Sequence, residues 1–454
     1  MAPELIIRGT TELQRMGPGG RGVLKHHDRD IFVAGAAPGD TVSVLVEHLS
    51  PHRLEAWGRV TAVHARSPSF VEPPCPRAWP VRGACGGCPL QHLSLTGRTF
   101  AKHSRVLDAL GLDIPFTIHP LAHITRYRNR ANFVAATGSD DLLILGSYAP
   151  RSRDVASMSG CLVHRAPIDA VADLLRALPL PAHPAPDALR YVTIRAGTDG
   201  DVCVELVLNT HDAPPWLRDA TDALMAHDAV VGVLRSANTS PGNTIHRGSE
   251  TLLAGRAYVT ERVGPLSFDV PPRAFVQLYS CVAQTMYQRA AELLVDPVTL
   301  WDLYCGVGGL GLTAALRHRG ARLLGVELHE DAVRIARDAA RRAGVDATFL
   351  ARDLSSVLSS RHLDDSLRDP DALLVNPPRR GLDAPTLELL ARVGRQLVYM
   401  SCDARSFARD TATLASHGWR PCAPVEVFDM LPMTEHVELL AHFTRDPPQA
   451  AEGA

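Results

Sequence analysis

The chain has 454 residues, 46% of them hydrophobic and 21% charged, and its formal net charge is −2. This length exceeds what one hydrophobic core usually holds and predicts two or three domains, with the composition of a soluble globular protein. The near-neutral total leaves nucleic-acid binding open, because only local basic patches matter to phosphate.

No stretch approaches the ~18 uncharged apolar residues of a membrane span, and the first residues lack the apolar core of a signal peptide. We therefore expect a cytoplasmic monomer without membrane contact. Lys25 and Lys102 are the only lysines among the 47 basic residues. Arginine is the better planar fork for phosphate.

Residues 1–68 have the pattern of short strands separated by glycine turns. The stretch "TVSVLVEHL" alternates apolar and polar residues with a period of two, and "APGD" before it is a turn sequence. A small β-barrel of the oligonucleotide-binding kind fits this length. Such a barrel either binds RNA or is purely structural.

Residues 69–280 begin at a proline-rich hinge, mix strands with helices and contain a cysteine cluster. Cys75, Cys85 and Cys88 lie close together, and Cys161 follows. In a reducing compartment a cysteine cluster favours a metal over disulfides. Four thiolates suit zinc or an iron–sulfur cluster equally on chemical grounds. Four unrelated cysteines are the alternative.

The stretch "HITRYRNRANF" in the same region interleaves arginines with aromatic residues. Arg126, Arg128 and Arg130 stand beside Tyr127 and Phe133. RNA-binding grooves combine such guanidinium groups with aromatic rings. We therefore expect this strip to bind RNA, and an exposed, solvated strand edge is the alternative.

From about residue 281 to residue 445, strands and helices alternate regularly, which predicts a mostly parallel, doubly wound α/β sheet. Strands are expected at 299–304, 322–327, 347–353, 371–376 and 396–402, helices at 310–319, 330–344, 384–393 and 404–418, and a closing strand pair at 425–431 and 437–443. Residues 446–454 are expected to be a disordered tail.

The first of these strands ends in a glycine-rich loop, "DLYCGVGGLG", from Asp302 to Gly311. Glu327 ends the second strand about 20 residues later, where an acid can bind both ribose hydroxyls. Asp353 and Asn376 end the third and fourth strands. Ligands of such sheets bind outside the carboxyl ends of the strands.

The glycine-rich loop lacks the spacing of a dinucleotide site and the lysine of a P-loop. A cofactor with ribose and adenine but no phosphate fits better, and we expect S-adenosylmethionine. Another nucleotide in a Rossmann-like domain is the alternative.

Two further residues at the same edge are candidates for covalent chemistry. Cys402 follows the fifth strand and precedes a helix, whose N-terminus would stabilise a thiolate. Glu438 leads into the last strand, where an acid next to the core needs a reason. The alternatives are a small core cysteine and a surface acid at the end of a strand.

Four blocks of this sequence, in their order and spacing, resemble the RNA uracil-5-methyltransferase family. They are "DLYCGVGGLGL", "VNPPRRG", "YMSCDARSFARD" and "FDMLPMTEHVELL". The likeness covers almost the whole chain. It implies a TRAM-like RNA-binding barrel at 1–68, a central α+β iron–sulfur domain at 69–280 and a Rossmann-like S-adenosylmethionine-dependent methyltransferase domain at 281–445. The asparagine of "NPPRRG" and the "FDM" look more like the 23S ribosomal RNA members than the transfer RNA branch.

The resemblance implies a methyl transfer to carbon 5 of a uridine in RNA, and the ribosomal branch implies 23S rRNA. Cys402 corresponds to the nucleophile that adds to carbon 6 and turns the ring into an enolate, and Glu438 to the base that removes the carbon 5 proton. A uridine inside folded RNA must be flipped out before carbon 6 is reachable.

The resemblance also assigns supporting residues. Cofactor contacts carry over to Gln277, Tyr304, Glu327 and Asn376, and Asp353 is added from its position at a strand end. The two prolines would fix the Asn376 side chain, and Arg379 would support the nucleotide or the loop. Cys75, Cys85, Cys88 and Cys161 resemble the family's [4Fe–4S] ligands, with zinc as the alternative and a longer first gap than usual.

Three positions in the expected pocket depart from the family pattern. Tyr279 and Gly309 stand where asparagine is usual, and Met433 where histidine is common. Two other functions stay open. One is an RNA-binding assembly factor with a vestigial pocket, and the other is an RNA cytosine-5-methyltransferase that uses the same thiol addition.

Overall fold

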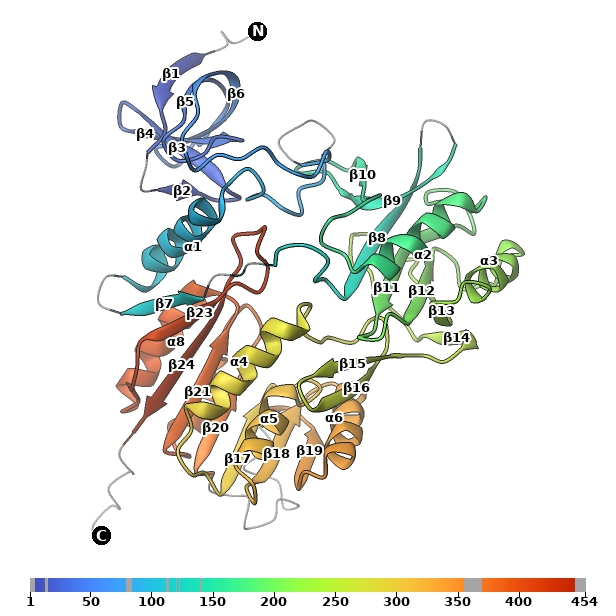
Figure 1. Cartoon of the computed structure of the whole chain (residues 1–454), viewed down its shortest axis with the longest axis vertical. Helices are drawn as coiled ribbons and strands as arrows, with labels where there is room; N and C mark the ends of the chain where they lie inside the picture. The colour runs from blue at the N-terminus through green and yellow to red at the C-terminus, as the bar shows by residue number, and fades with distance from the viewer. Residues whose placement is uncertain are drawn as a thin grey trace.

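The computed structural model describes residues 5–12, 15–78, 84–111, 114–119, 121, 123–138, 141–354 and 370–445. The tail at 446–454 lies outside the described residues. Among the helices that are described, none combines the length and the hydrophobicity needed to cross a bilayer. Three sheets and a separate hairpin are formed by these residues (Figure 1).

The N-terminal sheet has the strand order β1-β5-β6-β4-β3-β2. The alternation expected in β5 buries Val42 and Val44. Irregular register between β5 and β6 bends the pair, as β-bulges do. The short strands are confirmed, and a barrel stays a prediction. The strands are β1 (Ile6–Thr10), β2 (Met16–Gly17), β3 (Arg21–His26), β4 (Arg29–Ala34), β5 (Thr41–Leu49) and β6 (Glu55–Ala65).

The central sheet has the order β10-β9-β8-β11-β12-β13-β14, and α2 and α3 pack on it. Its inner strands β11 and β12 are buried along their whole length. The elements are β8 (Arg130–Thr137), β9 (Leu143–Tyr148), β10 (Val155–Ser157), α2 (Ala166–Ala177), β11 (Leu189–Ala196), β12 (Val202–Leu208), α3 (Trp216–Met225), β13 (Val230–Ala237) and β14 (Thr251–Gly255).

The C-terminal sheet has the order β19-β18-β17-β20-β21-β24-β23-β7, with β22 beside β24. The pairings from β19 to β21 are parallel, and β24 runs antiparallel to β21. Its strands are β7 (Phe116–His119), β17 (Thr299–Leu303), β18 (Arg322–Glu327), β19 (Ala347–Ala351), β20 (Ala372–Val375), β21 (Gln396–Ser401), β22 (Arg420–Pro421), β23 (Val425–Phe428) and β24 (Glu438–Thr444). The predicted doubly wound sheet is confirmed.

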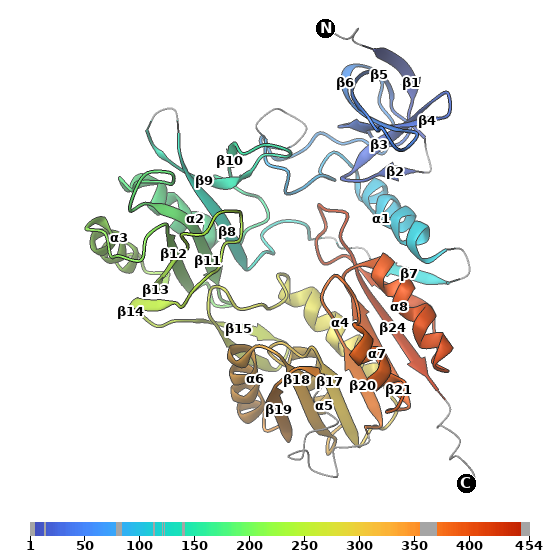
Figure 2. The ribbon, with the colours of Figure 1, turned by 180° about the vertical axis from the view of Figure 1, so that it is seen from behind.

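Helices cover both faces of this sheet (Figure 2). One face packs against α4 (Ser280–Glu292), α5 (Gly309–Arg317) and α6 (Glu330–Ala343), with the hairpin β15 (Val259–Val263) and β16 (Leu266–Val270) beside α6. The other face packs against α1 (Leu95–Leu110), α7 (Ala384–Leu390) and α8 (Ala404–Ser416).

Two elements from the first third of the chain join the C-terminal sheet. The helix α1 packs on α8, and β7 adds to β23 in parallel. Both lie in the 69–280 stretch that we assigned to a central domain. The four residues of β7 are too short to reveal a partner that is distant in sequence.

Candidate active site

The glycine-rich loop turns sharply between β17 and α5. Tyr304, Gly306 and Gly308 all have positive φ angles, of 61°, 53° and 82°. The backbone N–H of Gly306 donates to Glu327 Oε2 at 3.1 Å, so the acid at the end of β18 also holds the loop. A methyl group on Gly306 would meet nothing within 4 Å, which leaves open space against this turn.

A buried acid anchors the other end of the loop. Asp302 Oδ2 accepts a hydrogen bond from the Gly311 N–H at 2.8 Å, and burial raises the pKa of Asp302 to about 7. A side chain on Gly309 would lie 2.8 Å from the Tyr287 ring. The family's asparagine therefore does not fit here, because Tyr287 occupies its space.

The expected cofactor residues follow neighbouring strands of the sheet. Tyr304 follows β17, Glu327 ends β18, Asp353 follows β19 and Asn376 follows β20. The sheet order reverses at β17, which is the switch point where such sheets bind ligands. The structure therefore places these four residues at the one edge where the sequence predicted them.

Individual contacts fix several of these residues. The Tyr304 hydroxyl lies 2.7 Å from Thr386 Oγ1, and the Asn376 N–H points to the Leu303 carbonyl at 3.4 Å. Gln277 is buried in the segment before α4, where its carbonyl accepts a hydrogen bond from Asn129 Nδ2 at 3.0 Å.

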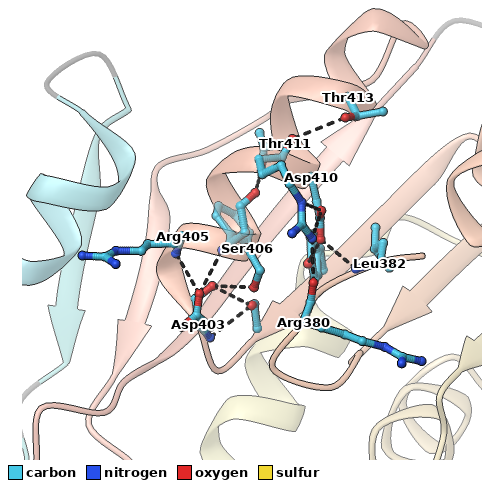
Figure 3. Close-up of polar contacts among 12 residues, drawn as sticks. Arg380, Leu382, Asp403, Arg405, Ser406, Asp410, Thr411 and Thr413 are labelled. Atoms are coloured by element: carbon cyan, nitrogen blue, oxygen red, sulfur yellow. Dashed lines mark hydrogen bonds and ion pairs between the residues drawn. The ribbon is translucent and has the colours of Figure 1, made fainter. Parts of the chain in front are cut away.

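The turn "NPPRRG" is fastened to α8 by one buried acid (Figure 3). Asp410 Oδ2 accepts hydrogen bonds from the Leu382 N–H at 2.7 Å and the Tyr399 hydroxyl at 2.8 Å. Arg409 donates to the Arg380 carbonyl at 2.6 Å. Gly381 has φ of 81°, and a Cβ there would lie 2.3 Å from Asp410 Oδ2. Only glycine allows this close approach.

Cys402 and Glu438 meet across an antiparallel strand pair. The register of β21 with β24 sets Ser401 opposite Leu439, so the next residues, Cys402 and Glu438, face each other. Glu438 is partly exposed as a residue, but its Oε2 is sealed and has no hydrogen-bond partner in the described structure. Sequence reasoning placed both residues at this edge without predicting that they are opposed.

Burial raises the pKa of Glu438 to about 8, and Arg379 opposes the rise. Burial also raises the pKa of Cys402 to about 11, with Glu438 adding to the rise and Arg379 opposing it. Burial and Glu438 both oppose the thiolate that the helix N-terminus was expected to stabilise. Asp403 caps α8 and accepts the N–H groups of Arg405 and Ser406, and Cys402 is half-buried beside Glu438.

Arg379 is the cation that acts on both groups. It lies 3.4 Å from His436 Nε2, and its charge lowers the pKa of Cys402 and of Glu438. Arg379 was expected to bind RNA or to support the loop, and its electrostatic effect on Cys402 and Glu438 was not predicted. Its position three residues after Asn376, in the same rigid turn, was the available signal.

The four cysteines expected to bind a metal line one cavity of about 40 Å³. Within the described ranges, however, no three His, Cys, Asp or Glu residues converge closely enough for a single metal ion. Burial raises the pKa of Cys88 to about 12, and the neighbouring thiols add to this. Burial disfavours the Cys161 thiolate, but His164 hydrogen-bonds to it and brings its pKa below the usual value.

The arginine strip differs from the expected open RNA surface. Arg126 donates to the Cys161 carbonyl at 3.2 Å and pairs with Asp169. Arg128 Nε donates to the Arg130 carbonyl at 3.0 Å, and Arg130 donates to the carbonyls of residues 273 and 274 at 3.2 and 3.1 Å. These guanidinium groups hold the chain's own backbone.

The aromatic residues of the strip are also internal. Tyr127 stacks on Tyr279 with ring centroids 4.8 Å apart, and Phe133 is fully buried. Tyr279, which stands where the family pattern has asparagine, thus packs against Tyr127. Neither ring is available to stack on a base, which corrects the expected interleaved RNA surface.

The fold and the edge just described define a class of protein, the Rossmann-like methyltransferases that use S-adenosylmethionine. A family model for tRNA (uracil-5-)-methyltransferases matches residues 252–445. An uncharacterized RNA methyltransferase of Gloeobacter violaceus is 30% identical, over 98% of this chain and 98% of its own. One of Listeria innocua is 28% identical, over 95% of this chain and 96% of its own.

A solved structure shares the whole fold. The tRNA (uracil-54, C5)-methyltransferase of Pyrococcus abyssi, in complex with S-adenosyl-L-homocysteine, aligns with a TM-score of 0.76 and 24% identity over 96% of this chain and 100% of that one. This chain belongs to the RNA uracil-5-methyltransferase family. It is therefore a member of an S-adenosylmethionine-dependent family that acts on RNA.

Proposed function

We propose that this protein methylates carbon 5 of a uridine in RNA through a covalent adduct on Cys402. One observation carries the proposal. Cys402 and Glu438 face each other across β21 and β24, with the charge of Arg379 acting on both, at the edge where the expected cofactor residues end. In this chemistry the nucleophile and the base must both be able to reach the same substrate ring.

The residues divide the reaction between them. The Cys402 thiolate forms a bond to carbon 6, which places the electron pair of the double bond on an enolate. S-adenosylmethionine, when bound, supplies the electrophilic methyl group for carbon 5. The Glu438 carboxylate then accepts the carbon 5 proton, the electron pair returns to the ring, and the bond from carbon 6 to sulfur breaks to release Cys402.

The raised pKa values assign a task to Arg379. Near neutral pH the free protein holds a thiol at Cys402 and a largely protonated Glu438. The guanidinium of Arg379 favours the charged form of each group, and the positive charge of the sulfonium would act in the same direction. Ionisation of Cys402 is therefore expected to follow binding of the cofactor and the RNA.

The residues at the sheet edge fit S-adenosylmethionine. Glu327 Oε2 holds the turn at Gly306, beside which a ligand has open space. Glu327 would bind the ribose hydroxyls, and Asp353 would bind near the adenine. The remainder of the cofactor would contact Tyr304, Asn376 and Gln277. The loop also lacks a phosphate-binding sequence, which agrees with a cofactor that has no phosphate group.

We propose a [4Fe–4S] cluster on Cys75, Cys85, Cys88 and Cys161. The four thiols line one cavity, and the likeness of their positions to the family's cluster ligands supports a cluster rather than zinc. The cluster would be structural. Arg126 links its Cys161 segment to the backbone of the arginine strip.

The RNA target is proposed to be 23S rRNA, with a flipped uridine and the N-terminal sheet as a TRAM-like RNA contact. The asparagine of "NPPRRG" and the "FDM" block support the ribosomal branch. The P. abyssi relative acts on transfer RNA, so 5-methyluridine should be mapped in both RNA classes from a strain that lacks this protein. Loss from tRNA alone would contradict the ribosomal target.

Covalent trapping tests the reaction. Wild-type protein with S-adenosylmethionine is expected to form a stable adduct with 5-fluorouridine RNA, because a base can remove a proton from carbon 5 but cannot remove fluorine, so the bond from carbon 6 to sulfur is not released. The variant Cys402→Ser should form none, while Cys281→Ser, at an exposed cysteine, should behave as wild type. Tritium release from [5-³H]uridine RNA but not from [5-³H]cytidine RNA excludes cytosine methylation. No release from either would indicate an RNA-binding factor.

A further inference from the structure

Lys102 lies at the centre of α1 and is fully buried, with 1% of its side chain exposed. Its ammonium group pairs with the Asp429 carboxylate and donates to the carbonyls of Leu431 and His436, each at 3.1 Å. The three oxygens use all three donors of the ammonium group. All of them belong to one segment, residues 429–437, which we call the 429–437 loop.

The chemistry of this contact requires lysine. Arginine fills 45 of the 47 basic positions, so lysine is rare in this chain and is kept at a fully buried position. An ammonium is a compact charge whose donors point in three directions, whereas a guanidinium is a wide planar fork. Three oxygens around one point match the donors of the ammonium, whereas a planar fork directs its donors differently.

The 429–437 loop leads directly into Glu438. Lys102 fixes the His436 carbonyl, two residues before the acid, and Val437 between them is buried. Glu438 Oε2 has no hydrogen-bond partner among the described residues. The position of the backbone that Lys102 holds therefore determines where the Glu438 side chain starts.

Other parts of the chain hold the same loop. The Leu90 N–H donates to the Met433 carbonyl at 3.0 Å, and Glu435 accepts the Gly19 N–H at 2.8 Å and pairs with Arg105 at 3.4 Å. These contacts fix the middle of the loop, whereas Lys102 ties its first residue to its last turn.

We propose that Lys102 is a positioning residue that aims Glu438 at the carbon 5 proton. This inference rests on the proposed function and adds a separate claim about one step. Adduct formation depends on Cys402, which lies in the connection between β21 and α8 and so stands on a different segment from the 429–437 loop. Proton removal depends on Glu438. Loss of Lys102 should therefore impair the second step and spare the first.

The test uses the full-length variant Lys102→Met/Asp429→Asn, which removes both charges and leaves no unpaired buried ion. Thermal unfolding establishes that it folds. The matched control, Arg341→Met/Asp338→Asn, neutralises an exposed ion pair on α6. Two rates are measured for each protein: adduct formation with 5-fluorouridine RNA, and tritium release from [5-³H]uridine RNA of a strain lacking the protein.

The double variant is expected to form the fluorinated adduct at about the wild-type rate, while tritium release falls toward the 10²–10⁴-fold that a general base contributes. On ordinary uridine RNA it should accumulate a methylated covalent protein–RNA species. Lys102→Arg should show the same split. Equal losses in both rates, or no loss in tritium release, would overturn the inference. A wild-type protein that forms no adduct would instead overturn the proposed function.

Discussion

The buried carboxyl group of Glu438 makes a quantitative prediction about stability that does not depend on catalysis. Burial raises its pKa from 4.5 to about 8, so the folded protein binds this proton more tightly than the unfolded chain does. Its contribution is fully present below pH 4.5 and is lost as the pH rises to about 8. At about 1.4 kcal/mol per pKa unit, the loss approaches 5 kcal/mol, an upper limit because the residue is partly exposed.

The variant Glu438→Gln cannot ionise and should not show this loss. We expect its free energy of unfolding, relative to wild type, to increase by about 2–4 kcal/mol between pH 5 and pH 8.5. Urea unfolding followed by tryptophan fluorescence reports on this region, because Trp301 and Trp419 are fully buried in the C-terminal sheet and its helices.

An exposed acid on α7 provides the control for this measurement. The variant Glu388→Gln should keep a constant difference from wild type over the same pH range, since its carboxyl group is in solvent. If Glu438→Gln also runs parallel to wild type, Glu438 is not an acid with a raised pKa. The argument that it waits in protonated form for the substrate would then fail.

Three further outcomes follow from the contacts. Gly381→Ala should lower the free energy of unfolding by about 1–3 kcal/mol in urea, and more than Gly418→Ala, which shares the positive φ but has open space around its Cβ. Glu327→Gln should weaken S-adenosylhomocysteine binding about 10- to 100-fold by calorimetry, and an unchanged affinity would contradict its role. Cys161→Ser should reduce the iron and acid-labile sulfide of anaerobically purified protein, and a metal content of zinc alone would refute the cluster.

The alternating strands and helices of the C-terminal sheet could be predicted because each element carries its own local pattern. The apolar strands β17, β20 and β21 and the strongly amphipathic α6 are recognisable without knowledge of their neighbours. For the same reason Glu327 and Asn376 could be placed at the carboxyl ends of strands. The side of the sheet on which a ligand binds follows from the fold class.

Long-range pairing and side-chain direction could not be predicted. That Cys402 faces Glu438 depends on β24 lying next to β21, which no local pattern encodes. The spacing of Arg126 and Arg130 is the same whether guanidinium groups reach RNA or backbone carbonyls, and here they reach carbonyls. The expectation of a thiolate at Cys402 did not take into account the Asp403 cap, the partial burial of Cys402 and its proximity to Glu438.

The pairing of β7 with β23 affects how the protein folds during synthesis and whether its methyltransferase domain can be produced alone. β7 lies in the first third of the chain and β23 near its C-terminal end, so the edge of the methyltransferase sheet closes only after almost all of the protein has left the ribosome. A fragment that starts at residue 281 would expose the unpaired edge of β23 and lose α1 with its lysine, and such edges invite aggregation. The methyltransferase domain is therefore expected to fold stably only together with the segment that precedes it.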